Sequence, residues 1–516
     1  MDISSRIFHQ YRVIGNFCCE KGFCMENVGS NNFVTTSIGN AFHTYDVKKL
    51  NLIAASDPVV ETIHMLSSTE NGEILCAHGT KLSVWKRGKM IGEPWIHESN
   101  ISRIYAIGNV VACYEESGEL NVYHVPERRL ISSIQFSGEF EITAWCHPPT
   151  YINKIVIGFK SGHLQIWNII TCQMVQSLTK FEGQITCIKE SPILDIIAVG
   201  VGSLLYIFNC KKNENIFLFK SDIEIAFISF RNTKDDVYHL AFCGVQSDIL
   251  ILDIEKNQLV CSIPAHTKNI SGINYVNCQP LLVTASGDNS IKIWIFDHMD
   301  GSARLLKSRS GIPDSISKLR FIPGPRGLNL LSASGSFLRF TNCNRDEQSF
   351  DFSYGRPRKD WKDKSSESRP FYLPPISDFD EYFFDNIVTC HQKTNWVQAW
   401  RLDKKKISKL KLKHSLLQNQ IPTCVKITAC GNNCMVGYNH GSLELFNLES
   451  GAHRASFVDT GRKSSAIVGV AVDGRNILCA SIDKSHLRIW FFKNHSLKTR
   501  VKLLFSPKKI EINRQK

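Results

Sequence analysis

The 516-residue sequence lacks the motifs that mark most enzymes, membrane proteins and secreted proteins. It has no Gly-rich phosphate loop ending in Lys-Ser/Thr, no H-E-x-x-H and no G-x-S-x-G. The longest apolar run, 193–208, contains Asp195 as well as glycine and serine, and is too short to span a bilayer. No apolar segment at the amino terminus has the form of a secretory signal. These absences predict a soluble, intracellular chain that is not an enzyme.

Cysteine is present in number, with 18 residues, but it lacks the spacing that disulfide frameworks and zinc sites need. The two local groups, from Cys18 to Cys24 and from Cys424 to Cys434, contain no C-x-x-C pair and no partnered pair of histidines. We therefore predict reduced thiols that behave as buried or half-buried small hydrophobes. The sequence predicts no metal, cofactor or small-molecule site.

A short hairpin pattern is the clearest feature that the sequence does contain. In T-A-S-G-D-N-S-I-K-I-W-I-F-D, from Thr284 to Asp297, three isoleucines alternate with Lys292, Trp294 and Phe296. Such alternation is typical of a β-strand, and the Gly-Asp-Asn before it suits a tight turn. The segment is therefore expected to be two strands joined by a turn.

Similar hairpins recur along the chain. Each can be marked by its aromatic or equivalent residue: Tyr45, Trp85, Tyr123, Trp167, Phe208, Leu252, Trp294, Phe340, Trp400, Phe446 and Trp490. Successive marks lie 38 to 46 residues apart, except for the 60-residue step between Phe340 and Trp400. This period is that of a β-propeller blade with four antiparallel strands. We predict an all-β fold of WD-repeat propellers, with one complete seven-bladed propeller followed by an incomplete second one.

The long step suggests how the chain is divided. It contains charged and Pro-rich sequence, which predicts a first propeller over 1–345, a basic linker over 346–385 and a partial propeller over 386–516. Eight marks precede residue 345, and two arrangements account for them. Strands around Tyr45 and Phe340 share one closing blade, or seven blades end at Trp294 and the eighth belongs to the next ring. Three later marks cannot close a ring, so we expect a shortened second propeller.

The net charge of +13 is concentrated in a few segments. The run R-L-D-K-K-K-I-S-K-L-K-L-K, 401–413, contains seven basic residues and one acid. It is expected either to contact RNA or an acidic partner, or to be an outer strand with one solvated face. The candidate contact residues are Lys404, Lys405, Lys406, Lys409, Lys411 and Lys413. Other basic residues lie in 356–364 and 508–516.

Acid pairs and histidines are assigned structural or solvent roles. Asp235-Asp236 and Asp380-Glu381 lie in loop-like sequence, where solvated charge is expected rather than general acid and base catalysis. His147, in C-H-P-P, is assigned a structural role in a turn between outer strands. A second histidine is expected to join a buried network that holds one blade together. The residues of this predicted network are His266, Ser286, Asp288 and Trp294.

Several longer segments carry a more specific resemblance. They are V-T-T-S-I-G-N-A-F-H-T-Y-D-V-K-K-L from Val34, H-P-P-T-Y-I-N-K-I-V-I-G from His147, P-L-L-V-T-A-S-G-D-N-S-I-K-I-W-I-F-D from Pro280, S-G-A-H-R-A-S-F from Ser450 and V-G-V-A-V-D-G from Val468. Together they resemble the WD repeat-containing protein 36 family, over about Phe33 to Trp490. The resemblance implies fourteen blades and a helical carboxyl-terminal domain, of which the last three blades and the helical domain are missing here.

The same resemblance implies a function. Its members are nucleolar, non-catalytic subunits of the UTP-B subcomplex of the small-subunit processome. They act in maturation of 18S rRNA with the box C/D small nucleolar RNP and precursor rRNA. An alternative from the fold alone is an interaction scaffold in ubiquitin ligation or in vesicle coats. The lack of an F-box-like helical segment argues against that alternative.

Overall fold

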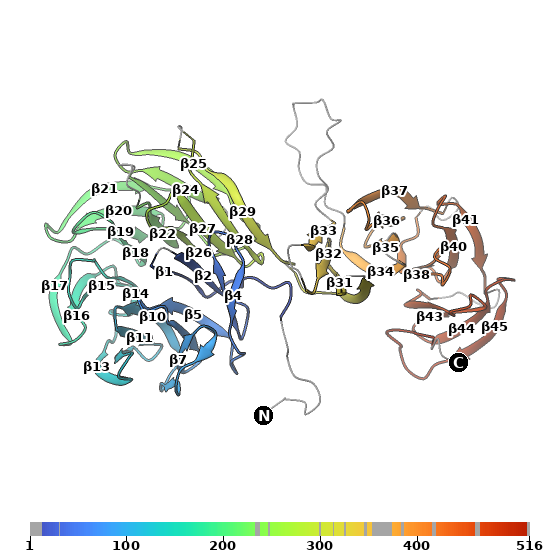
Figure 1. Cartoon of the computed structure of the whole chain (residues 1–516), viewed down its shortest axis with the longest axis horizontal. Coiled ribbons are helices and arrows are strands. Elements are labelled where there is room, and N and C mark those ends of the chain that lie inside the picture. The colour runs from blue at the N-terminus through green and yellow to red at the C-terminus, as the bar shows by residue number, and fades with distance from the viewer. Residues whose placement is uncertain are drawn as a thin grey trace. The chain divides into compact units, whose positions relative to one another are not determined.

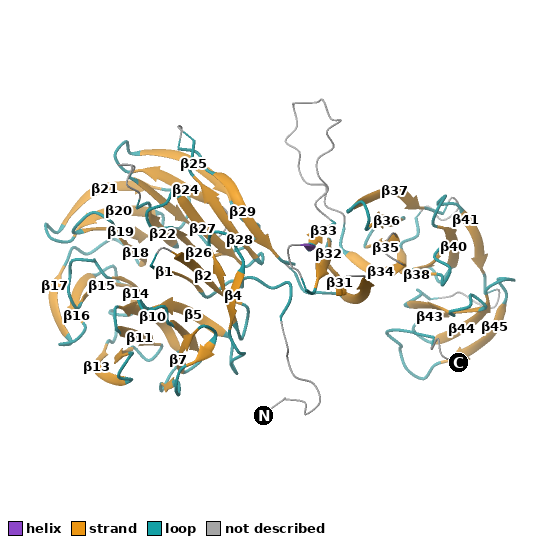
Figure 2. Ribbon diagram, viewed as in Figure 1, coloured by secondary structure: helices purple, strands orange, loops and turns teal. Residues whose placement is uncertain are grey.

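In the computed structural model the chain folds into antiparallel β-sheets connected by loops (Figure 1, Figure 2). The structure describes residues 13–29, 31–232, 238–245, 248–298, 301–312, 314–324, 327–344, 348–352, 374–382, 386–414, 419–459 and 465–512. These residues form ten four-stranded sheets and one five-stranded sheet. Within the same ranges, no helix has the length and apolar character needed to cross a bilayer. The predicted all-β fold is confirmed.

The sheets form two compact units, Gly15–Pro313 and a unit that includes Asp314–Lys516. The first unit begins with β1 (Phe23–Val28), β2 (Asn31–Ser37), β3 (Phe42–Asp46), β4 (Leu52–Ala55), β5 (Ile63–Ser68), β6 (Ile74–His78), β7 (Lys81–Lys86), β8 (Lys89–Met90), β9 (Trp95–Ile96), β10 (Ile101–Ile107), β11 (Val110–Glu115), β12 (Glu119–His124) and β13 (Arg129–Gln135). It continues with β14 (Ile142–Cys146), β15 (Lys154–Phe159), β16 (Leu164–Asn168), β17 (Gln173–Ser177), β18 (Ile185–Glu190), β19 (Ile196–Val201), β20 (Leu204–Asn209), β21 (Glu214–Lys220), β22 (Phe227–Phe230), β23 (His239–Cys243), β24 (Asp248–Asp253), β25 (Gln258–Pro264), β26 (Ile270–Tyr275), β27 (Leu281–Ser286), β28 (Ser290–Ile295) and β29 (Arg304–Ser310).

The second unit has four sheets in its described residues. Their strands are β30 (Lys318–Gly324), β31 (Gly327–Ser334), β32 (Phe337–Asn342), β33 (Phe350–Asp351), β34 (Ile376–Tyr382), β35 (Asn386–His391), β36 (Val397–Arg401), β37 (Lys406–Leu412), β38 (Pro422–Ile427), β39 (Asn433–Tyr438), β40 (Leu443–Asn447), β41 (His453–Phe457), β42 (Gly469–Val472), β43 (Leu478–Ile482), β44 (His486–Phe491) and β45 (Leu497–Lys502).

Each sheet corresponds to one sequence repeat. Every marked residue lies in the third strand of its sheet, from Tyr45 in β3 to Trp490 in β44. The strands pair in sequence order, except that β8 and β9 both pair with β7 in the second sheet. At many of the marks, such as Trp294, the pairing with the fourth strand shifts register. Such a bulge increases the local twist that lets blades splay around an axis.

The first unit is a closed ring of seven sheets (Figure 1). The innermost strands of its first and last sheets, β1 and β26, contact one another. Phe17, Val34 and Tyr45 of the amino-terminal part form one buried cluster with Val283 and Ile293 of the last sheet. The ring is therefore closed by packing of the first sheet against the last. The strands β1–β4 and β30–β33 form two separate sheets. The predicted sharing of one blade by strands around Tyr45 and Phe340 is wrong, and the alternative with seven blades ending at Trp294 describes the structure.

The sheet β30–β33 belongs with the blades that follow it. Leu338, Phe340 and Phe352 share a buried cluster with Phe379 and Trp400 of the next sheet. The units thus divide between Pro313 and Asp314, whereas the sequence placed the boundary near residue 345. The predicted linker, 346–385, contains two strands of the second unit, β33 and β34. The part between them, 353–373, lies outside the described residues and connects two sheets of the same unit.

Ion pairs join the innermost strands of the second unit. Asp380 on β34 is buried and pairs with Arg320 on β30 and with Lys426 on β38, and it accepts a hydrogen bond of 2.8 Å from the N–H of Ile427. Glu381 pairs with Arg320, and its burial raises its pKa to about 7. The expectation that Asp380-Glu381 is a solvated loop pair is wrong, because a carboxylate at this position links three blades. The other pair, Asp235-Asp236, lies outside the described residues.

Candidate functional site

The predicted blade network lies in the last sheet of the first unit. His266 is buried in the segment before β26, and its Nδ1 lies 3.1 Å from Asp288 Oδ2. Its Nε2 lies 2.8 Å from the hydroxyl of Thr284, and the indole N–H of Trp294 donates to that same hydroxyl at 3.2 Å. The partners fix the proton positions, since the carboxylate only accepts and the indole only donates. Neutral His266 therefore donates from Nδ1 and accepts at Nε2.

Both titrating groups of this network have shifted pKa values. Burial lowers the pKa of His266, which outweighs its hydrogen bond to Asp288. Burial also opposes ionisation of Asp288, but hydrogen bonds from His266, Ser290 and the N–H of Thr267 lower its pKa to about 2. A neutral imidazole beside an ionised carboxylate is a stable arrangement at neutral pH. All of these groups are engaged with one another, which suits a structural role.

The network differs from the predicted set in its hydroxyl group. Among the described residues, Ser286 makes no hydrogen bond to His266 or Trp294; it accepts one from the N–H of Asp288 at 3.1 Å and donates to the carbonyl oxygens of Lys268 and Asn269. Thr284 and Ser290 take the positions beside the imidazole. Sequence analysis missed both, although Thr284 lies two residues before Ser286 and therefore on the same face of β27.

The six lysines proposed for partner contact lie on or beside β37, the outermost strand of its sheet. We call β37 and its flanks, 404–413, the basic strand. Lys409, Lys411 and Lys413 are exposed, while Leu412 between them is fully buried. Lys404 and Lys405 are exposed in the preceding turn, and Lys406 begins the strand. The basic strand therefore has one apolar face and one cationic face.

Aromatic rings lie beneath several of these lysines. The Nζ atoms of Lys411 and Lys413 lie 4.8 and 5.2 Å from the ring centre of half-buried Trp396, and Nζ of Lys405 lies 4.7 Å from that of Phe350. Cation–π contacts of this kind orient an ammonium without neutralising it. The surface therefore presents positive charge at fixed positions. Of the other basic segments, Lys508 and Lys509 are exposed, and 356–364 lies outside the described residues.

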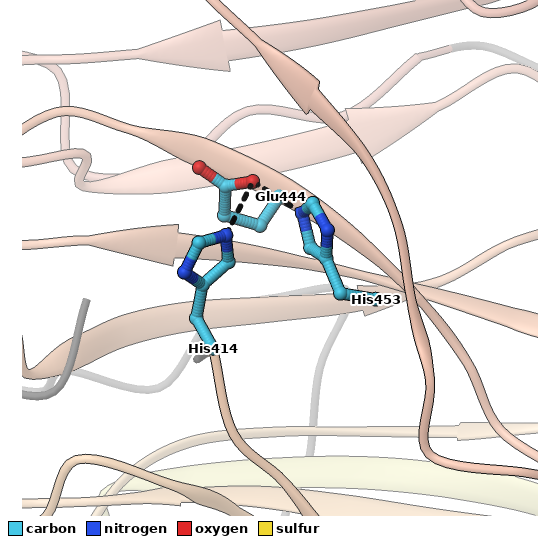
Figure 3. Close-up of side chains that lie close together, drawn as sticks. All are labelled: His414, Glu444 and His453. Carbon is cyan, nitrogen blue, oxygen red and sulfur yellow. Dashed lines mark hydrogen bonds and ion pairs between the residues drawn. The ribbon is translucent and has the colours of Figure 1, made fainter. Parts of the chain in front are cut away.

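A cluster of two histidines and one glutamate lies at the end of the basic strand (Figure 3). Glu444 on β40 and His414, in the connection after β37, are buried, and His453 begins β41. Nε2 of His453 lies 2.7 Å from Oε2 of Glu444, and Nε2 of His414 lies 3.8 Å from the same oxygen. Sequence analysis missed this cluster, which contains no spaced motif.

The cysteine thiols and His147, which the sequence also singled out, show no arrangement for catalysis or metal binding in the described residues. No disulfide joins the cysteines in the described ranges, and most are buried, although Cys278 and Cys430 are exposed. Burial raises the pKa of Cys18 and of Cys424 to about 12, which keeps them protonated and unreactive. His147 lies between β14 and β15, the two inner strands of its sheet, and not between outer strands as predicted. Its Nδ1 donates a 2.8 Å hydrogen bond to the carbonyl oxygen of Lys154.

One hollow, of about 470 Å³, lies between the sheets β14–β17 and β18–β21. Its lining includes Tyr151, Lys154, Leu194 and Asp195. These side chains do not form a set of nucleophile, base and orienting group.

Comparison with known proteins agrees with the division into units. The family model described as "WDR36/Utp21 first beta-propeller" matches residues 34–297, and the model described as "WDR36/Utp21 second beta-propeller domain" matches residues 317–516. These matches fall on either side of the boundary at Pro313.

Curated relatives match both units together. The chain is 32% identical over 495 residues to human WD repeat-containing protein 36, covering 92% of this chain and 54% of that protein. It is 32% identical over 511 residues to the U3 small nucleolar RNA-associated protein 21 homolog of Schizosaccharomyces pombe, covering 96% and 56%. For U3 small nucleolar RNA-associated protein 21 of Saccharomyces cerevisiae the identity is 25%, covering 92% and 53%. The chain spans about half the length of these relatives.

Proposed function

The chain belongs to the WDR36/Utp21 family, and we propose on that basis that it acts in ribosome biogenesis as a non-catalytic scaffold. In this proposal it works in the small-subunit processome of the nucleolus, in the processing of precursor rRNA to 18S rRNA. Its partners are other UTP-B proteins and the box C/D small nucleolar RNP. The observation that carries the proposal is the match of both units to one family, of which two members are named for association with U3 small nucleolar RNA.

The architecture supports a scaffold. Propeller blades are rigid, and the loops between their strands form broad rims on which several partners can dock at once. The titrating groups described above hold blades together, as in the His266 network and the Asp380 ion pairs. A scaffold needs such internal rigidity and no catalytic group.

The basic strand supports direct contact with RNA. Lys409, Lys411 and Lys413 project from the solvated face of β37, where an RNA backbone can approach without displacing protein. Each phosphate neutralised by such a lysine releases a counterion, which favours binding at low salt. We propose that these lysines, with Lys404, Lys405 and Lys406, contact precursor rRNA.

Copurification tests this proposal. The tagged chain is isolated from cells of its own source at about 100 mM salt, where phosphate contacts are retained. U3 small nucleolar RNA and precursor rRNA are then quantified against a tagged propeller of unrelated function. Enrichment of both RNAs, with UTP-B proteins identified by mass spectrometry, is the expected result. Recovery of ubiquitin-ligase or vesicle-coat subunits with neither RNA would reject it in favour of the alternative scaffold.

A further inference from the structure

The His414, Glu444 and His453 cluster has the donors of a metal site (Figure 3). Each residue offers one ligand atom, and the three atoms lie within 4.8 Å of one another. Two imidazole nitrogens and one carboxylate oxygen form a donor set that Zn²⁺ uses in proteins, with a fourth position open to water. We propose that these three side chains bind one zinc ion. This inference is independent of the proposed function.

The distances suit a small rearrangement around an ion. Zinc lies about 2.0–2.2 Å from nitrogen and oxygen ligands, so tetrahedral ligand atoms are separated by about 3.3 Å. The two distances to Glu444 Oε2, 2.7 and 3.8 Å, lie on either side of that value. The ring centres of His414 and His453 are 4.4 Å apart at an interplanar angle of 80°. Since all three ligand atoms lie within 4.8 Å of one another, their separations are near those that one zinc ion requires.

The carboxylate of Glu444 is buried, and a bound cation would stabilise its negative charge. The side chain of Glu444 is 4% exposed and that of His414 is 7% exposed, and in the described chain the ion-pair partners of Glu444 are these two histidines. A buried carboxylate without a permanent cation is costly. A divalent ion would supply that charge. The side chain of His453 is 29% exposed, which leaves a path for the ion and its water.

Neighbouring groups already orient the ligands. Glu444 pairs with Ser456 across β40 and β41, and the Ser456 hydroxyl donates to Oε2. The ring of Phe446 packs against that of His453 at 5.4 Å. Partners around the ligands hold them in place and raise metal affinity. Because His414 follows the sheet β34–β37 and the other two residues belong to β38–β41, the ion would clip neighbouring blades together.

Metal analysis of the full chain tests the site. The chain, purified without a polyhistidine tag and stripped with EDTA, is dialysed against micromolar Zn²⁺ and analysed by mass spectrometry for bound metal. Glu444→Gln and His453→Gln each remove one ligand, while His440→Gln changes an exposed histidine near β40 and serves as the matched control. Co²⁺ then reports the geometry, since tetrahedral cobalt absorbs strongly in the visible range.

We expect about one zinc ion per chain in the parent and in His440→Gln, and at least a tenfold loss of affinity in the two ligand variants. Circular dichroism identifies any variant that fails to fold. If Glu444→Gln unfolds, the more exposed His453→Gln decides the outcome. Zinc content unchanged by His453→Gln would overturn the proposal and assign the metal to other surface groups, as would a parent chain that binds no zinc.

Discussion

Asn289 lies 272 residues after Phe17, and its side-chain oxygen accepts a 2.6 Å hydrogen bond from the backbone N–H of Phe17. The same oxygen accepts from the N–H of Cys18 at 3.2 Å, and the amide group donates to the carbonyl oxygens of Gly15 and Ile312 at 2.9 Å. The backbone of Asn289 is in the left-handed conformation, with φ of 60°, and its buried side chain therefore joins the first and last residues of the ring.

Asn289→Ala should destabilise the first unit by about 2–4 kcal/mol, because buried N–H and carbonyl groups lose their partners and alanine disfavours positive φ. The matched control is Asn257→Ala, at an exposed position with φ of 54°. It should cost only about 1 kcal/mol. Urea unfolding followed by circular dichroism compares the two. Equal losses would show that the hydrogen bonds of Asn289 contribute little.

Trp294→Ala should lower the free energy of unfolding of the first unit by about 3–5 kcal/mol, the range for loss of a buried aromatic side chain. Trp294 is 8% exposed and belongs to the cluster between the sixth and seventh sheets. Trp294→Phe retains a ring but removes the N–H that donates to Thr284, and should cost less than half as much. Hydrogen exchange of β26–β29 provides the measurement. Unchanged protection in the alanine variant would contradict the assigned packing.

The first unit should lose stability as pH falls. The pKa of His266 is lowered by burial, so the stability from its neutral form is complete above about pH 6.5 and declines below it, as the unfolded chain takes up the proton. The pKa of Asp288 falls from 3.8 to about 2, so its contribution of about 2 kcal/mol persists above pH 3.8 and is lost towards pH 2.

Thermal melts between about pH 7.5 and pH 5 measure the first of these effects. His266→Gln should be less stable than the parent at neutral pH and should show a shallower decline below about pH 6.5, since one titrating group is removed. His239 also has its pKa lowered, so the decline should not vanish. If melting temperature fell with pH as steeply in His266→Gln as in the parent, His266 would not be a source of the pH dependence.

Lys409→Gln, Lys411→Gln and Lys413→Gln, combined, should weaken binding of precursor rRNA irrespective of its sequence. If each lysine contacts a phosphate, the slope of log affinity against log salt should fall by about 0.7 per residue. Lys180, Lys211 and Lys212 are exposed lysines of the first unit and provide the matched triple variant. Filter binding over a salt series compares the two. Equal slopes would reduce the basic strand to a solvated face.

The repeat could be predicted from sequence because its signals are local. Alternation, tight turns and one aromatic or equivalent residue placed the third strand of every sheet, including those of Tyr45 and Trp490. The boundary depended instead on which apolar faces meet, and Phe340 packs towards Trp400 although 60 residues separate them. Such a contact leaves no local pattern, because the insertion between two blades resembles a linker between two domains.

The functional residues were predicted less completely for the same reason. Thr284 and Ser286 share a face of one strand, and only the position of His266 decides which hydroxyl it meets. His414, Glu444 and His453 come together because β40 pairs with β41 and the connection after β37 lies beside them. Neither arrangement has a characteristic spacing. The basic strand was visible because its charges are consecutive in the sequence.

The hydrogen bond between Asn289 and Phe17 joins the two ends of the first unit, so the ring can close only after its last blade has been synthesised. At a translation rate of about 5–20 residues per second, the 272 residues between them take on the order of tens of seconds to appear. During that interval β1 and the apolar face around Val34 remain exposed, because the last sheet, against which they pack, has not yet been synthesised. We expect ribosome-bound chains ending before residue 289 to be cleaved by protease near β1, and chains long enough to expose Ile312 to be protected. Synthesis of the last blade is thus the step that closes the ring and buries apolar surface which the open intermediate exposes.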